Sequence, residues 1–135
     1  MLEICEENII DIHEQAPVSL AFVGDGVYEL LVRSRLVAHT RLQPNMLNRS
    51  KVHYVCAASQ FIALKALEPL LTEKEQGVVR RGKNATKATV AKHATAEEYR
   101  ASTALEALFG YLYLQNETQR IAQLFDVAWQ TLSEA

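Results

Sequence analysis

Two acidic residues stand inside segments whose other residues are mostly apolar. The first, Asp25, lies between Gly24 and Gly26 in the stretch LAFVGDGVYE. Glycine costs about 1 kcal/mol relative to alanine inside a helix, and aspartate is also a poor helix residue, so stability alone does not explain this triplet. Glycine lets another chain segment or a ligand approach the acid closely. Glu29 follows one helical turn later and shares a face with Asp25.

The second acid is Glu106, in the stretch STALEALFGYL, with Gly110 one turn further on. If the helices that carry Asp25 and Glu106 pack together, the two carboxylates converge. Ionised carboxylates repel each other in a partly dry site, and a cation between them relieves the repulsion. Oxygen ligands select a hard ion such as Mg²⁺, with Mn²⁺ as a substitute, and such an ion suits phosphodiester hydrolysis. The alternative is a pair of ordinary buried acids, each bound to arginine or to hydroxyl groups.

The elements that position these acids are predicted to be helical, so we expect an all-α fold. Apolar residues recur at helical spacing in several segments. The expected helices cover residues 19–37, 44–67, 72–82, 95–114 and 117–133. Pro17 and Ser19 mark the first start, with Ser19 as N-cap, and Pro69 ends the second helix. Capping-box spacing occurs twice, at Thr72 with Glu75 and at Thr95 with Glu98.

Length and composition bound the class of protein. The 135 residues, 49% hydrophobic and 22% charged, fit one globular domain over 1–135. No apolar run approaches the ~20 residues that cross a bilayer, which argues against a membrane partner. The acidic segment 1–16 lacks the pattern of a signal peptide. Two cysteines without a CxxC pair are consistent with a reducing compartment, so we expect a cytoplasmic protein.

The net charge of −2 conceals an uneven distribution. The segment 1–16 has no lysine or arginine, whereas residues 79–93 have no acid and overlap an expected basic loop over 83–95. The basic residues of this segment are Arg80, Arg81, Lys83, Lys87 and Lys92. One interpretation of such a concentration is contact with a polyanion. From charge alone, a solvated loop is the simpler interpretation.

Both acid-bearing segments resemble motifs of a known family. Residues 22–29, FVGDGVYE, resemble the ribonuclease III motif FLGD(A/S)VL, and residues 105–112, LEALFGYL, resemble its second catalytic block, (F/L)EALIGAIYL. The short chain, the QPN at 43–45 and the RRGKNA at 80–85 are similar to Mini-ribonuclease III in particular. That bacterial subfamily keeps the nuclease domain and lacks a separate double-stranded-RNA-binding domain.

This resemblance implies a ribonuclease III endonuclease domain that works as a helical homodimer. Asp25 then matches the main catalytic aspartate and Glu106 the essential glutamate, both as Mg²⁺ ligands. The implied reaction is cleavage of double-stranded RNA to 5′-phosphate ends, in the maturation of precursor large-subunit (23S) ribosomal RNA. A ribosomal protein on the precursor is a further expected partner. The resemblance also favours a subunit interface over the core for Leu20, Phe22 and Val23.

The resemblance changes the interpretation of the basic segment. Duplex RNA is recognised mainly through its phosphates and 2′-hydroxyls, which lysine and arginine contact. Because the resemblance implies a protein without a separate RNA-binding domain, the five basic residues of 79–93 become the expected RNA contacts.

The chain also departs from the family pattern. Family members usually carry acids where this chain has Val18 and Ala21, and an aspartate where it has Thr103. Thr103 can at best hold a water of the metal shell through its hydroxyl, and Glu29 at best assists from one turn away. The missing acids motivate an alternative function, a non-catalytic RNA- or ribosome-binding module with the same fold. A helical DNA-binding regulator has little support, because no helix-turn-helix spacing occurs.

Overall fold

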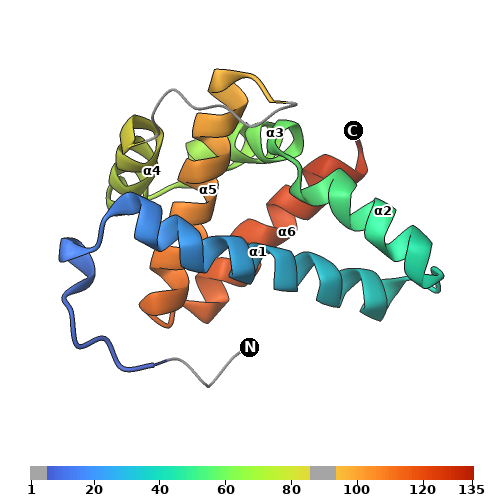
Figure 1. The fold of residues 1–135 in the computed structure, drawn as a ribbon, viewed down its shortest axis with the longest axis horizontal. Helices are drawn as coiled ribbons and strands as arrows, with labels where there is room; N and C mark the ends of the chain where they lie inside the picture. The colour runs from blue at the N-terminus through green and yellow to red at the C-terminus, as the bar shows by residue number, and fades with distance from the viewer. Residues whose placement is uncertain (1–5, 86–93) are drawn as a thin grey trace.

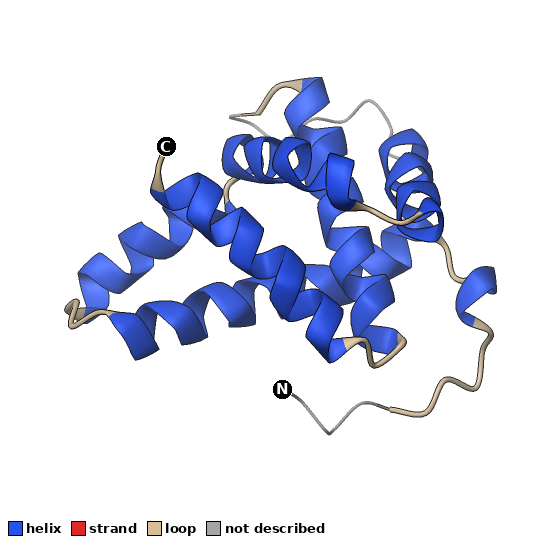
Figure 2. Cartoon of the chain, turned by 180° about the vertical axis from the view of Figure 1, so that it is seen from behind, coloured by secondary structure: helices blue, strands red, loops and turns tan. Residues whose placement is uncertain are grey.

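The structure is a computed structural model that describes residues 6–85 and 94–135. Within these residues the chain forms helices and no strand, which confirms the all-α prediction (Figures 1 and 2). The α-helices are α1 (Pro17–His39), α2 (Pro44–Val55), α3 (Ala57–Leu67), α4 (Glu73–Ala85), α5 (Ala96–Leu114) and α6 (Thr118–Ser133). In the described residues a short 3-10 helix, η1 (Ile12–Glu14), precedes α1, and another, η2 (Glu68–Leu70), lies between α3 and α4.

Helix α5 is the central element of the fold. It contacts α1, α3, α4 and α6, and Figure 1 shows α1 crossing in front of it. Its residues Ala104 to Gly110 are all buried except Glu106, which is partly buried. Because most of α5 faces apolar neighbours on several sides, its one central carboxylate is held among packed helices.

Aromatic side chains join three of the helices in the core. The ring of Tyr28 on α1 packs edge-on against Phe109 on α5, with 5.2 Å between ring centroids, and against Phe125 on α6 at 5.8 Å. Edge-to-face pairs of this kind add about 0.5–1.5 kcal/mol beyond the burial of their area. These contacts fix α1 against α5 just beyond the position of Asp25.

Both predicted capping boxes are confirmed. The backbone N–H of Glu75 donates to Thr72 Oγ1 at 3.2 Å, and the N–H of Thr72 donates to Glu75 Oε1 at 2.9 Å. The same reciprocal pair occurs between Thr95 and Glu98 at the start of α5, with both distances 3.0 Å. These caps place the first turns of α4 and α5 where the sequence pattern predicted them.

The prediction of a single helix over 44–67 is wrong, because the helix is interrupted at Cys56. This residue has an extended backbone (φ −65°, ψ 158°) between α2 and α3. The Ser59 hydroxyl donates to the carbonyl oxygen of His53, so a side chain satisfies an acceptor at the end of α2. The break lets α2 pack on α1 while α3 turns to pack on α5 and α6.

Two other helix ends differ from the sequence-based expectation. Helix α1 begins at Pro17 with Ala16 in the N-cap position, so the prediction of Ser19 as N-cap is wrong. Proline suits the first helical position because its missing N–H has no partner there in any case. Helix α4 reaches Ala85, so the first residues of the expected basic loop over 83–95 are helical. None of the described helices is long and apolar enough to span a membrane.

Candidate active site

The site is built where α1 and α5 cross, and glycines allow that crossing. A Cβ atom on Gly24 would overlap the backbone carbonyl oxygen of Glu106. A Cβ atom on Gly110 would likewise overlap the carbonyl oxygen of Leu20. The two helices therefore touch backbone to backbone, and only glycine fits at either position. By contrast, Gly26 faces open space, with nothing within 4 Å of its Cβ position.

This close crossing brings the two predicted acids together. Asp25 follows Gly24 directly, and its carboxylate interacts with the carboxyl group of Glu106. Asp25 is exposed, whereas Glu106 is partly buried. Burial, followed by the negative charge of Asp25, raises the pKa of Glu106 to about 8. The acid pair is therefore unfavourable in its fully ionised form unless a cation lies beside it.

The chemistry of the pair fits a hard divalent cation. All the donor atoms that Asp25 and Glu106 offer are carboxylate oxygens, which Mg²⁺ prefers. In the described part of the chain no group of three histidine, cysteine or acidic side chains could hold a metal. Two carboxylates leave most positions around an ion to water or phosphate oxygens, as is usual for Mg²⁺ at nucleic-acid-processing sites.

A third polar residue of the site was not found from the sequence. Gln60 on α3 is buried, with 2% of its surface exposed, and its Nε2 donates to Glu106 Oε2 at 3.5 Å. Its Oε1 accepts a hydrogen bond from the hydroxyl of Ser102 on α5. The only signal in the sequence is an amide within the mostly apolar stretch CAASQFIAL. Nothing in this local pattern shows that the amide faces α5.

Comparison with known proteins identifies the family of this chain. Residues 18–117 match the family model of the ribonuclease III domain. The chain belongs to the ribonuclease III family. It is 45% identical to the Mini-ribonuclease 3 of Symbiobacterium thermophilum, over 83% of this chain and 86% of that protein. It is 42% identical to the Mini-ribonuclease 3 of Brevibacillus brevis, over 92% of both chains.

A solved structure also has this ribonuclease III fold. The crystal structure of a protein from Fusobacterium nucleatum superposes with a TM-score of 0.81 and is 28% identical in sequence. The match covers 89% of this chain and 96% of the other. The predicted resemblance to Mini-ribonuclease III is confirmed, and the chain is a ribonuclease III family endoribonuclease.

Two residues expected to assist in this ribonuclease III site have other partners. The carboxylate of Glu29 pairs with Arg33 Nε at 3.0 Å and with Lys51 Nζ at 3.6 Å. The hydroxyl of Thr103 donates to the carbonyl oxygen of Tyr99 at 3.2 Å, within α5. Both oxygens of Glu29 therefore face cations, while the oxygen of Thr103 keeps lone pairs that can accept a hydrogen bond.

The basic residues expected to contact RNA are only partly described. Arg80 and Arg81 are exposed near the end of α4. Lys83 is partly buried, and its Nζ lies 3.3 Å from Glu68 Oε2. Lys87 and Lys92 lie outside the described residues. The described part of this ribonuclease III domain thus presents two arginines to solvent on α4.

The three apolar residues predicted at a subunit interface have different environments. Leu20 is buried in a cluster with Ala21, Val78 and Ala107, so its predicted place at an interface is wrong. Phe22 is 85% exposed, and Val23 is partly buried. Leu20 lies on the side of α1 that packs inward, which its neighbours in sequence alone did not show.

Proposed function

We propose that this ribonuclease III family member hydrolyses double-stranded RNA with Mg²⁺, at the site formed by Asp25 and Glu106. The observation that carries the proposal is the convergence of these two acids at the glycine crossing of α1 and α5. Each acid belongs to one of the two motifs that resemble the family's catalytic blocks. Mn²⁺ is expected to replace Mg²⁺, since both ions prefer oxygen ligands.

In this proposal Asp25 and Glu106 hold the ion, and the remaining polar residues support them. A bound Mg²⁺ would supply an activated water and would neutralise charge on the phosphate. Attack of a water on phosphorus with loss of the 3′ oxygen would leave a 5′-phosphate and a 3′-hydroxyl end. Asp25 is exposed, so a duplex can reach it from solvent. Thr103 can accept a hydrogen bond from a water near the site. Glu29, one turn from Asp25, pairs with Arg33 and Lys51.

The proposed RNA contacts are Arg80, Arg81 and Lys83 on α4, together with Lys87 and Lys92. The two arginines support this role because they are exposed and lie near each other at one end of α4. Guanidinium groups bind phosphate oxygens with two parallel hydrogen bonds, which suits an A-form backbone. These contacts would bind duplex RNA largely independently of its sequence.

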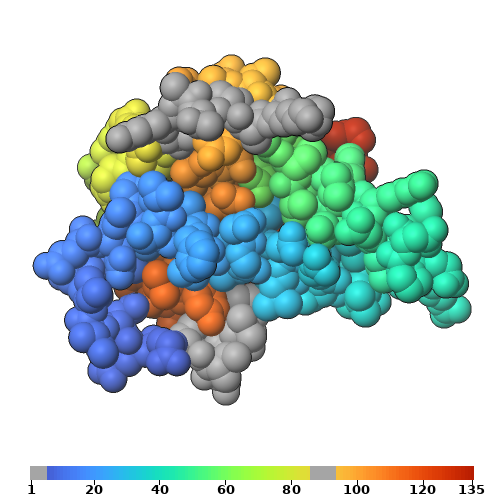
Figure 3. All heavy atoms as spheres, viewed as in Figure 1, coloured from blue at the N-terminus to red at the C-terminus, as the bar shows by residue number. Residues whose placement is uncertain are grey.

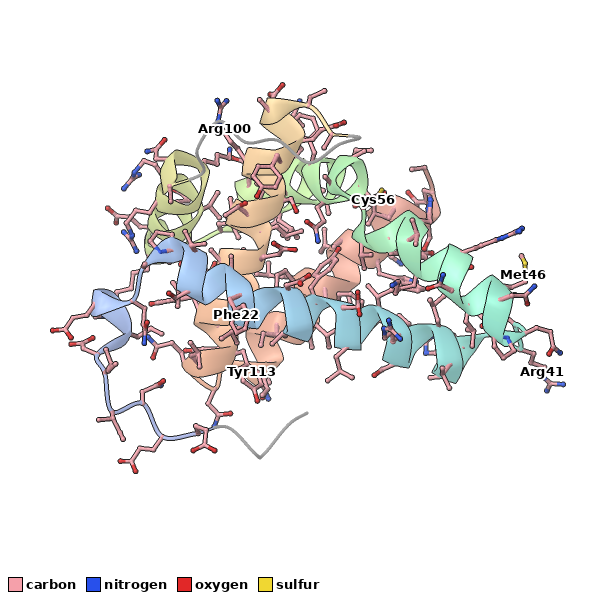
Figure 4. All side chains as sticks on the ribbon, in the orientation of Figure 1. Phe22, Arg41, Met46, Cys56, Arg100 and Tyr113 are labelled. Atoms are coloured by element: carbon pink, nitrogen blue, oxygen red, sulfur yellow. The ribbon has the colours of Figure 1, made fainter. Side chains whose placement is uncertain are left out.

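The domain is proposed to act as a homodimer through the outer face of α1. Exposed apolar residues follow one stripe along this helix, and α1 runs uncovered across the face drawn in Figure 3. The stripe consists of Val18, Phe22, Leu30 and Val37. Figure 4 shows Phe22 on the outer side of α1. Between Phe22 and Leu30 lies Gly26, which leaves open space beside them.

A second copy of the chain is the partner that this stripe fits best. A two-fold interface pairs the same surface with itself. The exposed Phe22 of each copy can therefore fill the open space at Gly26 of the other copy. The stripe also adjoins Asp25 in sequence, so pairing through it would bring two acid pairs near one duplex. One cut in each strand of the duplex would follow from that arrangement.

The proposed substrate is precursor 23S ribosomal RNA in the cytoplasm, with a ribosomal protein on the precursor as a further partner. Support comes from the resemblance to Mini-ribonuclease III and from the relatives that bear the name Mini-ribonuclease 3. A cleavage map of precursor ribosomal RNA tests this part of the proposal. Cuts confined to one duplex near an end of the large-subunit precursor are expected, and cuts spread evenly over unrelated duplexes would contradict it.

The central experiment compares wild-type protein with Asp25→Asn and Glu106→Gln on a 5′-labelled RNA duplex, with Mg²⁺, Mn²⁺ or EDTA. Each substitution should lower the cleavage rate by about 100-fold or more while duplex binding is kept. The matched control is Asp126→Asn, an exposed acid on α6 that pairs with Arg35 at 2.6 Å. Cleavage by Asp25→Asn at the wild-type rate would remove the proposed role of Asp25.

The same assay distinguishes the second candidate, a non-catalytic RNA- or ribosome-binding module. This candidate is motivated by Val18, Ala21 and Thr103, which stand at positions where the family usually has acids. Tight duplex binding without cleavage by wild-type protein, over a wide range of Mg²⁺ and Mn²⁺ concentrations, would favour it over the nuclease.

A further inference from the structure

Gln60 is buried where stability alone would favour an apolar side chain. It is one of three buried polar or charged residues in the described part of the chain, the others being Ser59 and Glu75. Its neighbours on α3, Ala63 and Leu64, are apolar and fully enclosed. A buried amide costs free energy unless its hydrogen bonds are made, so its partners indicate why it is there.

Both partners of the Gln60 amide lie on one face of α5. Its Oε1 accepts a hydrogen bond from Ser102, and its Nε2 donates to Glu106 at 3.5 Å. Ser102 and Glu106 are four residues apart, hence one turn apart on that helix. The amide of Gln60 therefore spans one turn of α5 and contacts the carboxylate of Glu106 from the side of α3.

The orientation of this amide follows from the chemistry of its partners. The NH₂ group of Gln60 faces Glu106 and its carbonyl oxygen faces the hydroxyl of Ser102. This orientation suits the ionised carboxylate that would hold a cation, because that form only accepts hydrogen bonds. Ser102 supplies the donor that this orientation needs. The neighbouring hydroxyl of Thr103 is directed back along α5 to Tyr99 instead. Ser102 is thus the hydroxyl in this turn that reaches α3.

We propose that Gln60 is a positioning residue, which holds the Glu106 carboxylate opposite Asp25 and is itself oriented by Ser102. A carboxylate at the end of a glutamate side chain can turn about several bonds, and each rotation moves its oxygens away from an ion bound beside Asp25. The amide restricts these rotations before any ion or RNA binds. This inference rests on the proposed function, because it assigns to Glu106 the role of a metal ligand.

Three variants test the role of Gln60. Gln60→Met keeps the length of the side chain and removes the donor, and Ser102→Ala removes the group that orients the amide. The matched control is Ser59→Ala, the neighbouring buried residue, whose hydroxyl bonds to His53 instead of to the acid pair. Thermal unfolding of each variant shows that the protein is folded at the assay temperature.

Two quantities are measured on each folded variant. The first is the affinity for Mn²⁺, measured by calorimetry in the absence of RNA. The second is the Mg²⁺ concentration that gives half-maximal single-turnover cleavage. Loss of a group that orients a metal ligand typically costs about 10- to 100-fold in metal affinity or activity. Gln60→Met should therefore weaken Mn²⁺ binding by about 10-fold and raise the Mg²⁺ midpoint similarly, with duplex affinity unchanged. Ser102→Ala should shift both in the same direction by less, and Ser59→Ala should shift neither.

Wild-type Mn²⁺ affinity and a wild-type Mg²⁺ midpoint in Gln60→Met would overturn the inference. If Gln60→Met does not fold, the same result in Ser102→Ala would overturn it. Failure of the proposed function has a different signature. Wild-type protein would then bind duplex RNA without cutting it, while the Mn²⁺ measurement would still report whether Gln60 supports the acid pair.

Discussion

The backbone carbonyl of Glu106 lies directly against the Cα of Gly24, in the space that a side chain at residue 24 would fill. This contact joins the two sequence motifs at their acids. The same crossing places Gly110 against the carbonyl of Leu20, so the approach of α1 to α5 depends on a glycine from each helix. The glycines that weaken each helix alone are what allow the acids to meet.

Alanine at Gly24 is expected to destabilise the protein severely. The added Cβ meets backbone atoms of α5, which cannot move aside without separating the helices, so a cost of about 3 kcal/mol or more is expected. Chemical denaturation followed by circular dichroism measures it. The matched control is Gly77→Ala in α4, where the Cβ would meet only the flexible side chains of Arg81 and Arg80. That variant should be neutral or gain up to about 1 kcal/mol of helix propensity.

The metal-free protein should lose stability as the pH rises. Burial and the charge of Asp25 raise the pKa of Glu106 from 4.5 to about 8, so the folded state binds this proton more tightly than the unfolded state does. The resulting stabilisation is complete below about pH 4.5 and is lost as the pH rises through about 8. Thermal midpoints measured in EDTA across this range should fall, and Mg²⁺ should restore them at the alkaline end.

The variant Glu106→Gln is the control for this pH dependence. It has no carboxyl group to ionise, so its thermal midpoint should lack this fall and should exceed that of the metal-free wild-type protein at about pH 8. Parallel pH profiles for wild-type protein and Glu106→Gln would show that the acid pair does not cause the fall of the thermal midpoint.

Breaking the ion pair between buried Glu75 and partly buried Arg120 should destabilise the protein. Arg120 Nε and Nη2 donate to the two carboxylate oxygens at 2.9 and 2.8 Å, and Nη2 also donates to the carbonyl oxygen of Leu70 at 2.8 Å. Arg120→Met leaves the Glu75 carboxylate without a cation, and only 5% of the surface of Glu75 is exposed. A loss of about 3–5 kcal/mol is expected in urea denaturation.

An exposed pair provides the comparison for Arg120. Arg33→Met breaks the pair with Glu29 on the surface of α1 and should cost less than about 1 kcal/mol. Burial would raise the pKa of Glu75, but hydrogen bonds from Arg120 and Thr72 bring it below the ordinary value. The stabilisation from this carboxylate is therefore present at neutral pH and lost in acid. Equal urea midpoints for Arg120→Met and Arg33→Met would contradict the larger contribution expected of the Glu75–Arg120 pair.

The exposed Phe22 should control the oligomeric state. Phe22→Asp places a charge in the centre of the α1 stripe and should raise the dimer dissociation constant by roughly 30-fold or more, without unfolding the chain. Analytical ultracentrifugation over a concentration series measures this change. Ile62→Asp serves as the control, since Ile62 is also exposed but lies on α3, away from the stripe. Dissociation by both variants alike would argue against pairing through α1.

The exposed arginines of α4 should govern the salt dependence of RNA binding. Arg80→Gln and Arg81→Gln should each weaken duplex binding and lower the slope of log affinity against log salt by about one per lost phosphate contact. Arg41→Gln is the control, because Arg41 is also exposed but lies just after α1, on the other side of the molecule from α4 (Figure 4). Fluorescence anisotropy with a labelled duplex at several salt concentrations provides the slopes. An unchanged slope in the α4 variants would indicate that duplex RNA binds to another surface of the protein.

Local patterns in the sequence determined most of the helices, because helix formation depends on residues within one or two turns. The capping boxes at Thr72 and Thr95 and the 3.6-residue apolar period fixed where α4 and α5 begin. The acids of the two motifs also stood out locally, since Asp25 and Glu106 interrupt apolar segments. The amino-acid sequence alone was therefore enough to predict the family, the fold class and the central acid pair.

Tertiary packing decided the features that depend on residues far apart in the chain. The break at Cys56 arises because α2 and α3 pack on different helices, and no local pattern specifies those partners. The contact of Gln60 with Glu106 likewise requires α3 to lie beside α5. Gly24 was an anomaly in the sequence, and the backbone of Glu106 against it gives the reason. A short-range pattern sets which helices form, but only their packing sets which side chains meet.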